Sequence, residues 1–231
     1  MKALFLFALI AELMQPPAPR FQQLTFRTAD GAAIRYGLAI PTDNPPGQLH
    51  PLVLALHPGG EKTPYYGDQY MRQIFLPGLG ALDPIMVAPD CPTRAWSDPE
   101  AEQAVMELID SVIAKYPIDR HRILVTGFSL GGSGTWFMSS RHADVLTAAI
   151  VMAGRTDESL DRLAKIPTYV IHSRNDEVVP FDQAEQRAAE LEHLGRIVKF
   201  EALEGVGHFD MRGYLGALER AGRWVTEHWD K

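Results

Sequence analysis

The chain has 231 residues, which is enough for one sizeable α/β domain and too few for two comfortable ones. Its net charge of −7 and its pI of about 5.6 argue against nucleic acid or an anionic membrane as a partner. The single cysteine, Cys91, excludes an intrachain disulfide, and the scattered histidines form no His-x-x-x-His pair, so we expect no metal site.

The N-terminus has a basic start and a short apolar run. Lys2 is followed by apolar residues 3–11, which is typical of a secretory signal peptide and too short for a membrane anchor. Prolines at 16, 17 and 19 then predict a linker. We expect a signal peptide at 1–11, a linker at 12–20 and a single domain at 21–231, in a secreted or periplasmic protein. A buried first helix or strand is the alternative for residues 3–11.

Hydrophobic periodicity predicts strands alternating with helices after the linker. The predicted strands are 24–28, 33–40, 51–56, 85–88, 122–126, 147–152, 167–172 and 197–203. Helices are predicted behind Ser97 as far as Tyr116, from Ser133, and at about 181–194 and 213–229, whereas 63–80 is expected to be irregular with one or two helical turns. This order predicts a mostly parallel sheet with helices on both faces, an antiparallel edge hairpin at the start and no large lid domain.

The segment Gly127-Phe128-Ser129-Leu130-Gly131 lies between a predicted strand and a predicted helix. Strand, Gly-x-Ser-x-Gly and helix in this order indicate a nucleophile elbow, in which the serine hydroxyl is exposed on a strained turn. The glycines remove the Cβ atoms that would crowd the strand or the helix. The alternative is an ordinary Gly-rich turn whose serine only caps the helix.

A serine nucleophile needs a base and a group that orients the base. Asp176 follows the strand that ends at His172, and His208 follows the strand that ends at Leu203. In a parallel sheet such residues gather at the carboxyl ends of the strands. The order Ser129, Asp176, His208 is that of an α/β-hydrolase, with His208 as base and Asp176 as orienter.

Other residues compete for these roles. Glu177 adjoins Asp176 and is the alternative orienter if the loop is shifted by one residue. Asp157 and Asp182 are further candidates, although Asp182 is expected in the first turn of the next helix. His57 also lies at a strand end, but it precedes the serine, and we expect it to pack the neighbouring loop.

An oxyanion hole needs two N–H donors. The first is expected from Leu130, the residue after the nucleophile, where a helix N-terminus also favours negative charge. The second is expected from the segment His57-Pro58-Gly59-Gly60. Because Pro58 has no N–H, Gly59 is the best candidate and Gly60 the next.

As an ordered set, these motifs resemble the α/β-hydrolases. The matching pieces are 56–61, 88–92 with Trp96, 118–122, 175–180 and 207–208. The similarity is to compact serine esterases, a branch that also holds feruloyl esterases, polyhydroxybutyrate depolymerase-like and dienelactone hydrolase-like proteins, and sequences labelled as prolyl-oligopeptidase-type peptidases. Pro58 stands where that family usually has glycine. The resemblance implies hydrolysis of a small-molecule ester through an acyl-serine, without a cofactor.

Three functions are compatible with these features. The first is a carboxylic-ester hydrolase and the second is a serine peptidase that acts on short peptides. The ester hydrolase is favoured, because peptidases of the fold commonly carry a large additional domain and none fits here. A hydrolase-fold binding protein without turnover is the third reading, and the intact Ser129, Asp176 and His208 argue against it. Trp96 is the candidate substrate-binding residue. Four other aromatic residues could line a pocket for an aromatic or sugar ring, although such residues more often lie in the core: Tyr65, Tyr66, Tyr70 and Trp136.

Overall fold

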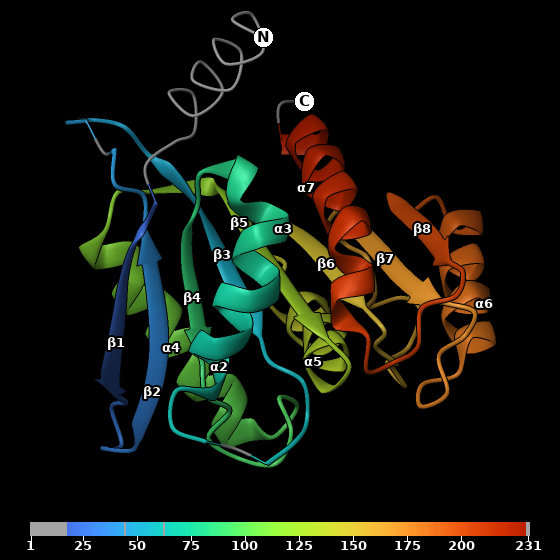
Figure 1. Cartoon of the computed structure of the whole chain (residues 1–231), viewed down its shortest axis with the longest axis horizontal. Helices are drawn as coiled ribbons and strands as arrows, with labels where there is room; N and C mark the ends of the chain where they lie inside the picture. The colour runs from blue at the N-terminus through green and yellow to red at the C-terminus, as the bar shows by residue number, and fades with distance from the viewer. Residues whose placement is uncertain (1–17, 44, 62, 230–231) are drawn as a thin grey trace, which may run out of the picture.

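The computed structural model describes residues 18–43, 45–61 and 63–229, so the predicted signal peptide lies outside the described residues. The described chain forms an eight-stranded sheet in the order β1-β2-β4-β3-β5-β6-β7-β8 (Figure 1). The strands are β1 (Arg20–Arg27), β2 (Ala33–Ile40), β3 (His50–Leu56), β4 (Ile85–Pro89), β5 (Ile118–Phe128), β6 (Ala148–Met152), β7 (Thr168–Ser173) and β8 (Val198–Leu203). The predicted linker lies outside the described residues as far as residue 17, and β1 begins at its last residue, Arg20.

The sheet is parallel except at the end where the chain enters it. β1 pairs with β2 as an antiparallel hairpin, and β2 pairs antiparallel with β4. From β4 to β8 all neighbours are parallel. The predicted α/β fold with an antiparallel edge hairpin and no large lid domain is therefore confirmed.

Helices cover both faces of the sheet, as Figure 1 shows. They are α2 (Tyr66–Tyr70), a π-helical turn η1 (Met71–Phe75), α3 (Leu76–Leu79), a 3₁₀ turn η2 (Gly80–Leu82), α4 (Pro99–Lys115), α5 (Leu130–Arg141), α6 (Phe181–His193), η3 (Met211–Tyr214) and α7 (Leu215–Trp229). Alternate residues of β3 point to the two faces: Leu54 packs with α4 and α5, and Val53 packs with η1, α3 and α7. This explains why β3 is a continuous apolar run. None of the helices described here is long and apolar enough to cross a membrane.

The segment before β4 is more helical than its sequence predicts. Helical turns follow one another from Tyr66 to Leu82, where only one or two turns were expected. Asp90, at the end of β4, accepts hydrogen bonds from the backbone N–H groups of Tyr65 (2.9 Å) and Gly67 (3.0 Å). A carboxylate distant in sequence thus satisfies and stabilises the start of the helix, as an N-terminal acidic residue would.

Candidate active site

Ser129 occupies a strained turn between β5 and α5. Its φ of 54° and ψ of −114° lie outside the usual regions for a residue with a side chain, at a typical cost of about 1–3 kcal/mol. Its N–H donates to the carbonyl of Met152 (2.9 Å), which ties the turn to β6. A Cβ on Gly127 would collide with the Gly131 backbone, and a Cβ on Gly131 with the Leu56 carbonyl. The tight approach of α5 to the sheet therefore requires both glycines.

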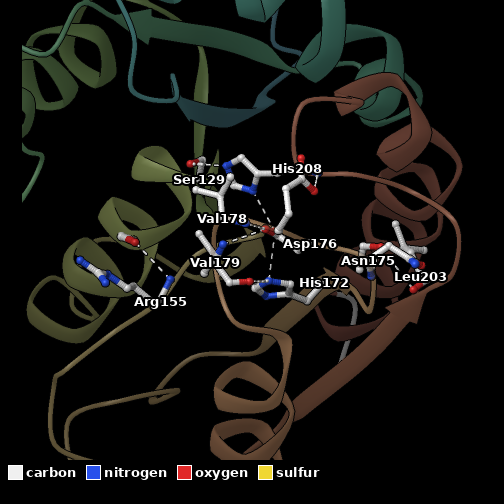
Figure 2. Close-up of polar contacts among 12 residues, drawn as sticks. Ser129, Arg155, His172, Asn175, Asp176, Val178, Val179, Leu203 and His208 are labelled. Carbon is white, nitrogen blue, oxygen red and sulfur yellow. Dashed lines mark hydrogen bonds and ion pairs between the residues drawn. The ribbon is translucent and has the colours of Figure 1, made fainter.

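The three residues predicted to act together lie in one hydrogen-bonded row (Figure 2). His208 Nε2 is 2.8 Å from Ser129 Oγ, and His208 Nδ1 is 2.8 Å from Asp176 Oδ2. Because an ionised carboxylate only accepts, Nδ1 carries the proton, and Nε2 accepts from the serine hydroxyl. This arrangement suits transfer of the serine proton to the imidazole.

Asp176 is held by backbone as well as by side chains. Its Oδ1 accepts from the N–H groups of Val178 (2.9 Å) and Val179 (2.7 Å), and its side chain has no exposed surface. Burial alone would raise the pKa of this carboxyl, but hydrogen bonds from His208, Val179 and Val178 outweigh it and keep the pKa below its usual range. Asp176 therefore stays ionised beside the imidazole.

The loop after β7 and the loop after β8 are joined at further points. Asn175 Oδ1 accepts from the Gly205 N–H, at 2.6 Å. Glu177 Oε2 accepts from the backbone N–H of His208, at 3.0 Å. Glu177 thus holds the backbone of the histidine, whereas Asp176 holds its ring.

The other acidic candidates lie elsewhere. Asp182 is in the first turn of α6, as expected. Asp157 lines two clefts beside α6 and α5, and neither cleft includes Ser129 or His208. The structure therefore brings Asp176, and not Asp157 or Asp182, to the His208 ring.

The two candidate oxyanion donors are close neighbours. A Cβ built on Gly59 would lie 3.8 Å from Leu130 Cβ, and both residues line the pocket that holds Ser129. Neither backbone N–H donates a hydrogen bond within the described part of the chain. Two N–H groups from residues that line the pocket of the serine suit a developing oxyanion.

His57 and Trp96 lie behind the Gly59 segment. The fully buried His57 ring accepts from the Cys91 N–H at Nε2 (3.0 Å), so Nδ1 donates to the Pro58 carbonyl (2.7 Å). Trp96 is 1% exposed, and its Nε1–H donates to the His57 carbonyl (3.1 Å). The structure therefore places Trp96, expected on the substrate wall, beneath the loop and outside the pocket lining.

The pocket around Ser129 has a volume of about 710 Å³. Its walls come from the Gly59 segment, from α2 and η1, and from the residues after His208. Sequence reasoning did not assign several of the lining residues: Gln73, Ile74, Val178, Phe209, Met211 and Arg212. Phe209 and Val178 are 81% and 51% exposed, which is unusual for apolar side chains and was not visible in the sequence. Tyr70 also lines the pocket, and its hydroxyl is 3.1 Å from that of Tyr66.

Metal ligands are not gathered at this site. In the ranges that the structure describes, no group of three or more His, Cys, Asp or Glu side chains is arranged to hold a metal ion.

Comparison with known proteins agrees with the fold. Residues 73–214, more than half of the chain, match the model of the Dienelactone hydrolase family. The chain belongs to this family of α/β-hydrolases. Over 84 residues it is 30% identical to the bifunctional acetylxylan esterase/xylanase XynS20E of Neocallimastix patriciarum, a stretch that covers 36% of this chain and 12% of that protein.

Solved esterases have the same fold. A thermostable esterase is 27% identical with a TM-score of 0.73, and the match covers 90% of this chain and 62% of that one. A ferulic acid esterase is 17% identical with a TM-score of 0.73, and the match covers 91% of this chain and 98% of that one. At that identity the likeness shows the fold alone. These comparisons therefore show membership of the Dienelactone hydrolase family and the fold of an α/β-hydrolase.

Proposed function

We propose that the protein hydrolyses a carboxylic ester through an acyl-serine intermediate on Ser129. The observation that carries the proposal is the row of hydrogen bonds from Ser129 Oγ through His208 to Asp176, each 2.8 Å long. Membership of the Dienelactone hydrolase family supports hydrolytic chemistry.

In the acylation step, Ser129 Oγ forms a bond to the ester carbonyl carbon while its proton passes to His208 Nε2. The carbonyl oxygen becomes an oxyanion, which accepts hydrogen bonds from the Leu130 and Gly59 N–H groups. Asp176 stabilises the imidazolium. The carbonyl then re-forms, the C–O bond to the alcohol breaks, and the imidazolium gives its proton to the departing oxygen.

Deacylation repeats these events with water. The water oxygen bonds to the acyl carbon while His208 takes a proton from the water. The imidazolium then protonates Ser129 Oγ as the bond between Ser129 Oγ and the acyl carbon breaks. The products are a carboxylic acid and the free enzyme. No cofactor takes part in either step.

The substrate proposed is a small ester with an apolar part. The pocket has about 710 Å³ of space, and the exposed ring of Phe209 stands on its wall. Exposed apolar side chains at a pocket commonly contact ligands.

The test combines labelling with a pair of serine variants. A fluorophosphonate probe should modify Ser129, and Ser129→Ala should lower p-nitrophenyl ester turnover by about 10³-fold or more. Ser133 is the matched control: it lies one helical turn away on α5, and its Oγ accepts from the Arg155 N–H (3.1 Å). Ser133→Ala should remain active.

Other results would change the assignment. Undiminished turnover by folded Ser129→Ala would overturn the proposal. Faster cleavage of peptide anilides than of esters would favour a serine peptidase. A folded wild-type protein with no labelling and no turnover would favour a binding protein.

Export is a second, separate proposal, and it rests on Lys2 and the apolar residues 3–11. N-terminal sequencing of protein secreted by its own host should begin after Ala11 or within the Pro-rich segment. Recovery from the cytosol of a protein that begins at Met1 would contradict export.

A further inference from the structure

His172, at the end of β7, is a buried titratable side chain beside the proposed catalytic row. The ring has no exposed surface, and it is absent from the pocket lining. Its Nε2 is 3.0 Å from the Val179 carbonyl oxygen and 3.2 Å from Asp176 Oδ2 (Figure 2). It therefore cannot touch a substrate, but it does touch the residue proposed to orient His208.

The contacts of the ring fix its tautomer. A carbonyl oxygen and an ionised carboxylate only accept hydrogen bonds, so Nε2 must carry the proton. Nδ1 is buried and has no hydrogen-bond partner in the described residues. A second proton there would bury a charge without a partner, and burial accordingly lowers the pKa of His172 below its usual value. His172 is therefore a neutral donor.

His172 and His208 share one oxygen of Asp176. Oδ1 is occupied by the N–H groups of Val178 and Val179. Oδ2 accepts a hydrogen bond from His208 Nδ1 at 2.8 Å. His172 Nε2, which donates to the Val179 carbonyl at 3.0 Å, lies 3.2 Å from the same carboxylate oxygen. With donors on both oxygens, the carboxylate cannot rotate without breaking several hydrogen bonds.

We propose that His172 is a positioning residue for catalysis: its Nε2–H fixes the plane of the Asp176 carboxylate and takes up part of the charge on Oδ2 that faces His208. This inference rests on the proposed ester hydrolysis. Asp176 on the same loop and His208 from the loop after β8 are the titratable groups that act on His172, and from α6 the uncharged Phe181 ring packs against it with centroids 6.0 Å apart.

The variants His172→Gln and His172→Asn form a matched pair. A Gln amide nitrogen reaches close to the place of Nε2 and keeps a donor for Asp176. An Asn side chain is shorter by one methylene and places its nitrogen near Nδ1, so the donor to Asp176 is lost. Both variants keep a polar, uncharged side chain.

The expected results concern turnover and pH. His172→Asn should lower kcat about tenfold, equivalent to one hydrogen bond of ordinary strength, with KM unchanged. Loss of the donor concentrates charge on Oδ2 and stabilises the imidazolium, so the acid limb of the pH–rate profile should move to higher pH. His172→Gln should restore both kcat and the acid limb. In an Asp176→Asn background, His172→Asn should cause no further loss.

A merely structural role gives a different pattern. If His172 only ties the loop through Val179, His172→Asn lowers stability, leaves the acid limb in place and has the same effect in both backgrounds. That pattern, or a folded His172→Asn variant with wild-type kcat and acid limb, would overturn the proposal. If His172→Asn does not fold, His172→Phe takes its place in the same measurements. All rates are Ser129-dependent turnover, so Ser129→Ala tests the proposed function separately.

Discussion

The two sides of the pocket are held in place by different kinds of contact. On the histidine side, formed by Asp176, His208 and the loops 173–180 and 204–210, side chains of one loop accept N–H groups of the other. On the glycine side, formed by residues 57–61, the His57 ring packs against Tyr66 and Trp96, each with ring centroids 4.9 Å apart. One side depends on hydrogen bonds between adjacent strand ends, and the other on aromatic packing and a few hydrogen bonds between distant segments.

This difference separates what each side contributes to the proposed chemistry. The histidine side moves a proton, so its charges and donors must be fixed to within a fraction of an ångström. The glycine side presents backbone N–H groups, so it needs a rigid loop rather than a particular charge. Removing a charge on the histidine side should therefore affect turnover far more than removing one hydrogen bond on the glycine side.

The largest expected effect is that of Asp176→Asn. Asparagine keeps the shape but removes the charge that stabilises the imidazolium, and it favours the wrong tautomer. We expect kcat to fall by about 10³ to 10⁴ with the fold intact.

Glu177→Gln is the matched control for Asp176→Asn. Among the described residues, the Glu177 carboxylate accepts only the backbone N–H of His208, and a Gln amide oxygen can also accept it. We expect its kcat to remain within about threefold of wild type, less than the effect of one ordinary hydrogen bond. If Glu177→Gln is inactive and Asp176→Asn retains its rate, the orienter is Glu177 and the comparison of the two sides fails.

On the glycine side, Trp96→Phe should have a smaller effect. The change removes the Nε1–H bond to the His57 carbonyl, while the ring stays packed over Gly134, where a Cβ would lie 2.6 Å from Trp96 Cβ. We expect kcat to fall about tenfold and the unfolding free energy by about 1 kcal/mol, as for one hydrogen bond.

Trp136→Phe controls for the loss of a buried indole. Trp136 is 2% exposed and packs with Val151 and Leu163, away from the Gly59 segment. It should lower stability and leave kcat unchanged. An equal loss of kcat in both variants would mean that Trp96 acts through general packing and not through the loop.

The histidine side was predictable from sequence, because its order follows the strands. Asp176 and His208 each come shortly after a strand end, and parallel strands end at one edge of the sheet. Chain order and spacing were therefore enough to predict that these two residues lie beside Ser129. The sheet was also predictable from sequence, because its strands carry clear hydrophobic patterns. β2 has the predicted bounds, and β3 is apolar on both faces.

The glycine side was less predictable, because burial is a property of the whole fold. An aromatic residue near a motif can line a pocket or pack beneath the loop that forms the pocket. The sequence around Trp96 does not distinguish these two roles. The helical run 66–82 depends on Asp90, more than twenty residues after its start, and no local capping pattern records that contact. The sequence marks His172 only as the end of a strand, because its contact with Asp176 forms only when the loop turns back.

Acid should destabilise the histidine side in two steps. Burial lowers the pKa of His172 below 6.5 in the folded protein, so the unfolded chain binds more protons and stability falls as pH drops below about 6.5. The pKa of Asp176 is lowered from 3.8 despite its burial, because hydrogen bonds from His208, Val179 and Val178 outweigh desolvation. The stability that Asp176 contributes is therefore present above pH 3.8 and is lost as the pH falls through the pKa of Asp176 in the folded protein. Urea unfolding of wild type and His172→Gln at pH 7.5 and 5.5 measures the first step.

The His172→Gln variant should lose less stability between these two pH values than wild type does. Other histidines titrate in both proteins, so the difference between the two slopes belongs to His172. Equal slopes would mean that His172 is protonated equally in the folded and unfolded states, contrary to its burial.

The smallest expected effect on catalysis is that of Phe209→Ala. This variant tests the wall of the pocket and not the contacts that hold the histidine side or the glycine side in place. Phe209 is 81% exposed, so its loss should leave the unfolding free energy unchanged. Its ring lines the pocket beside His208, with centroids 5.5 Å apart. A partial apolar contact of this size contributes less than about 1 kcal/mol to binding, so KM should rise about threefold for an aromatic ester and stay the same for an acetate. Leu194→Ala removes a comparably exposed apolar side chain outside the pocket, 57% exposed, and should change neither KM. An equal rise in KM for both esters would mean that Phe209 fixes the conformation of loop 204–210 instead of contacting the substrate.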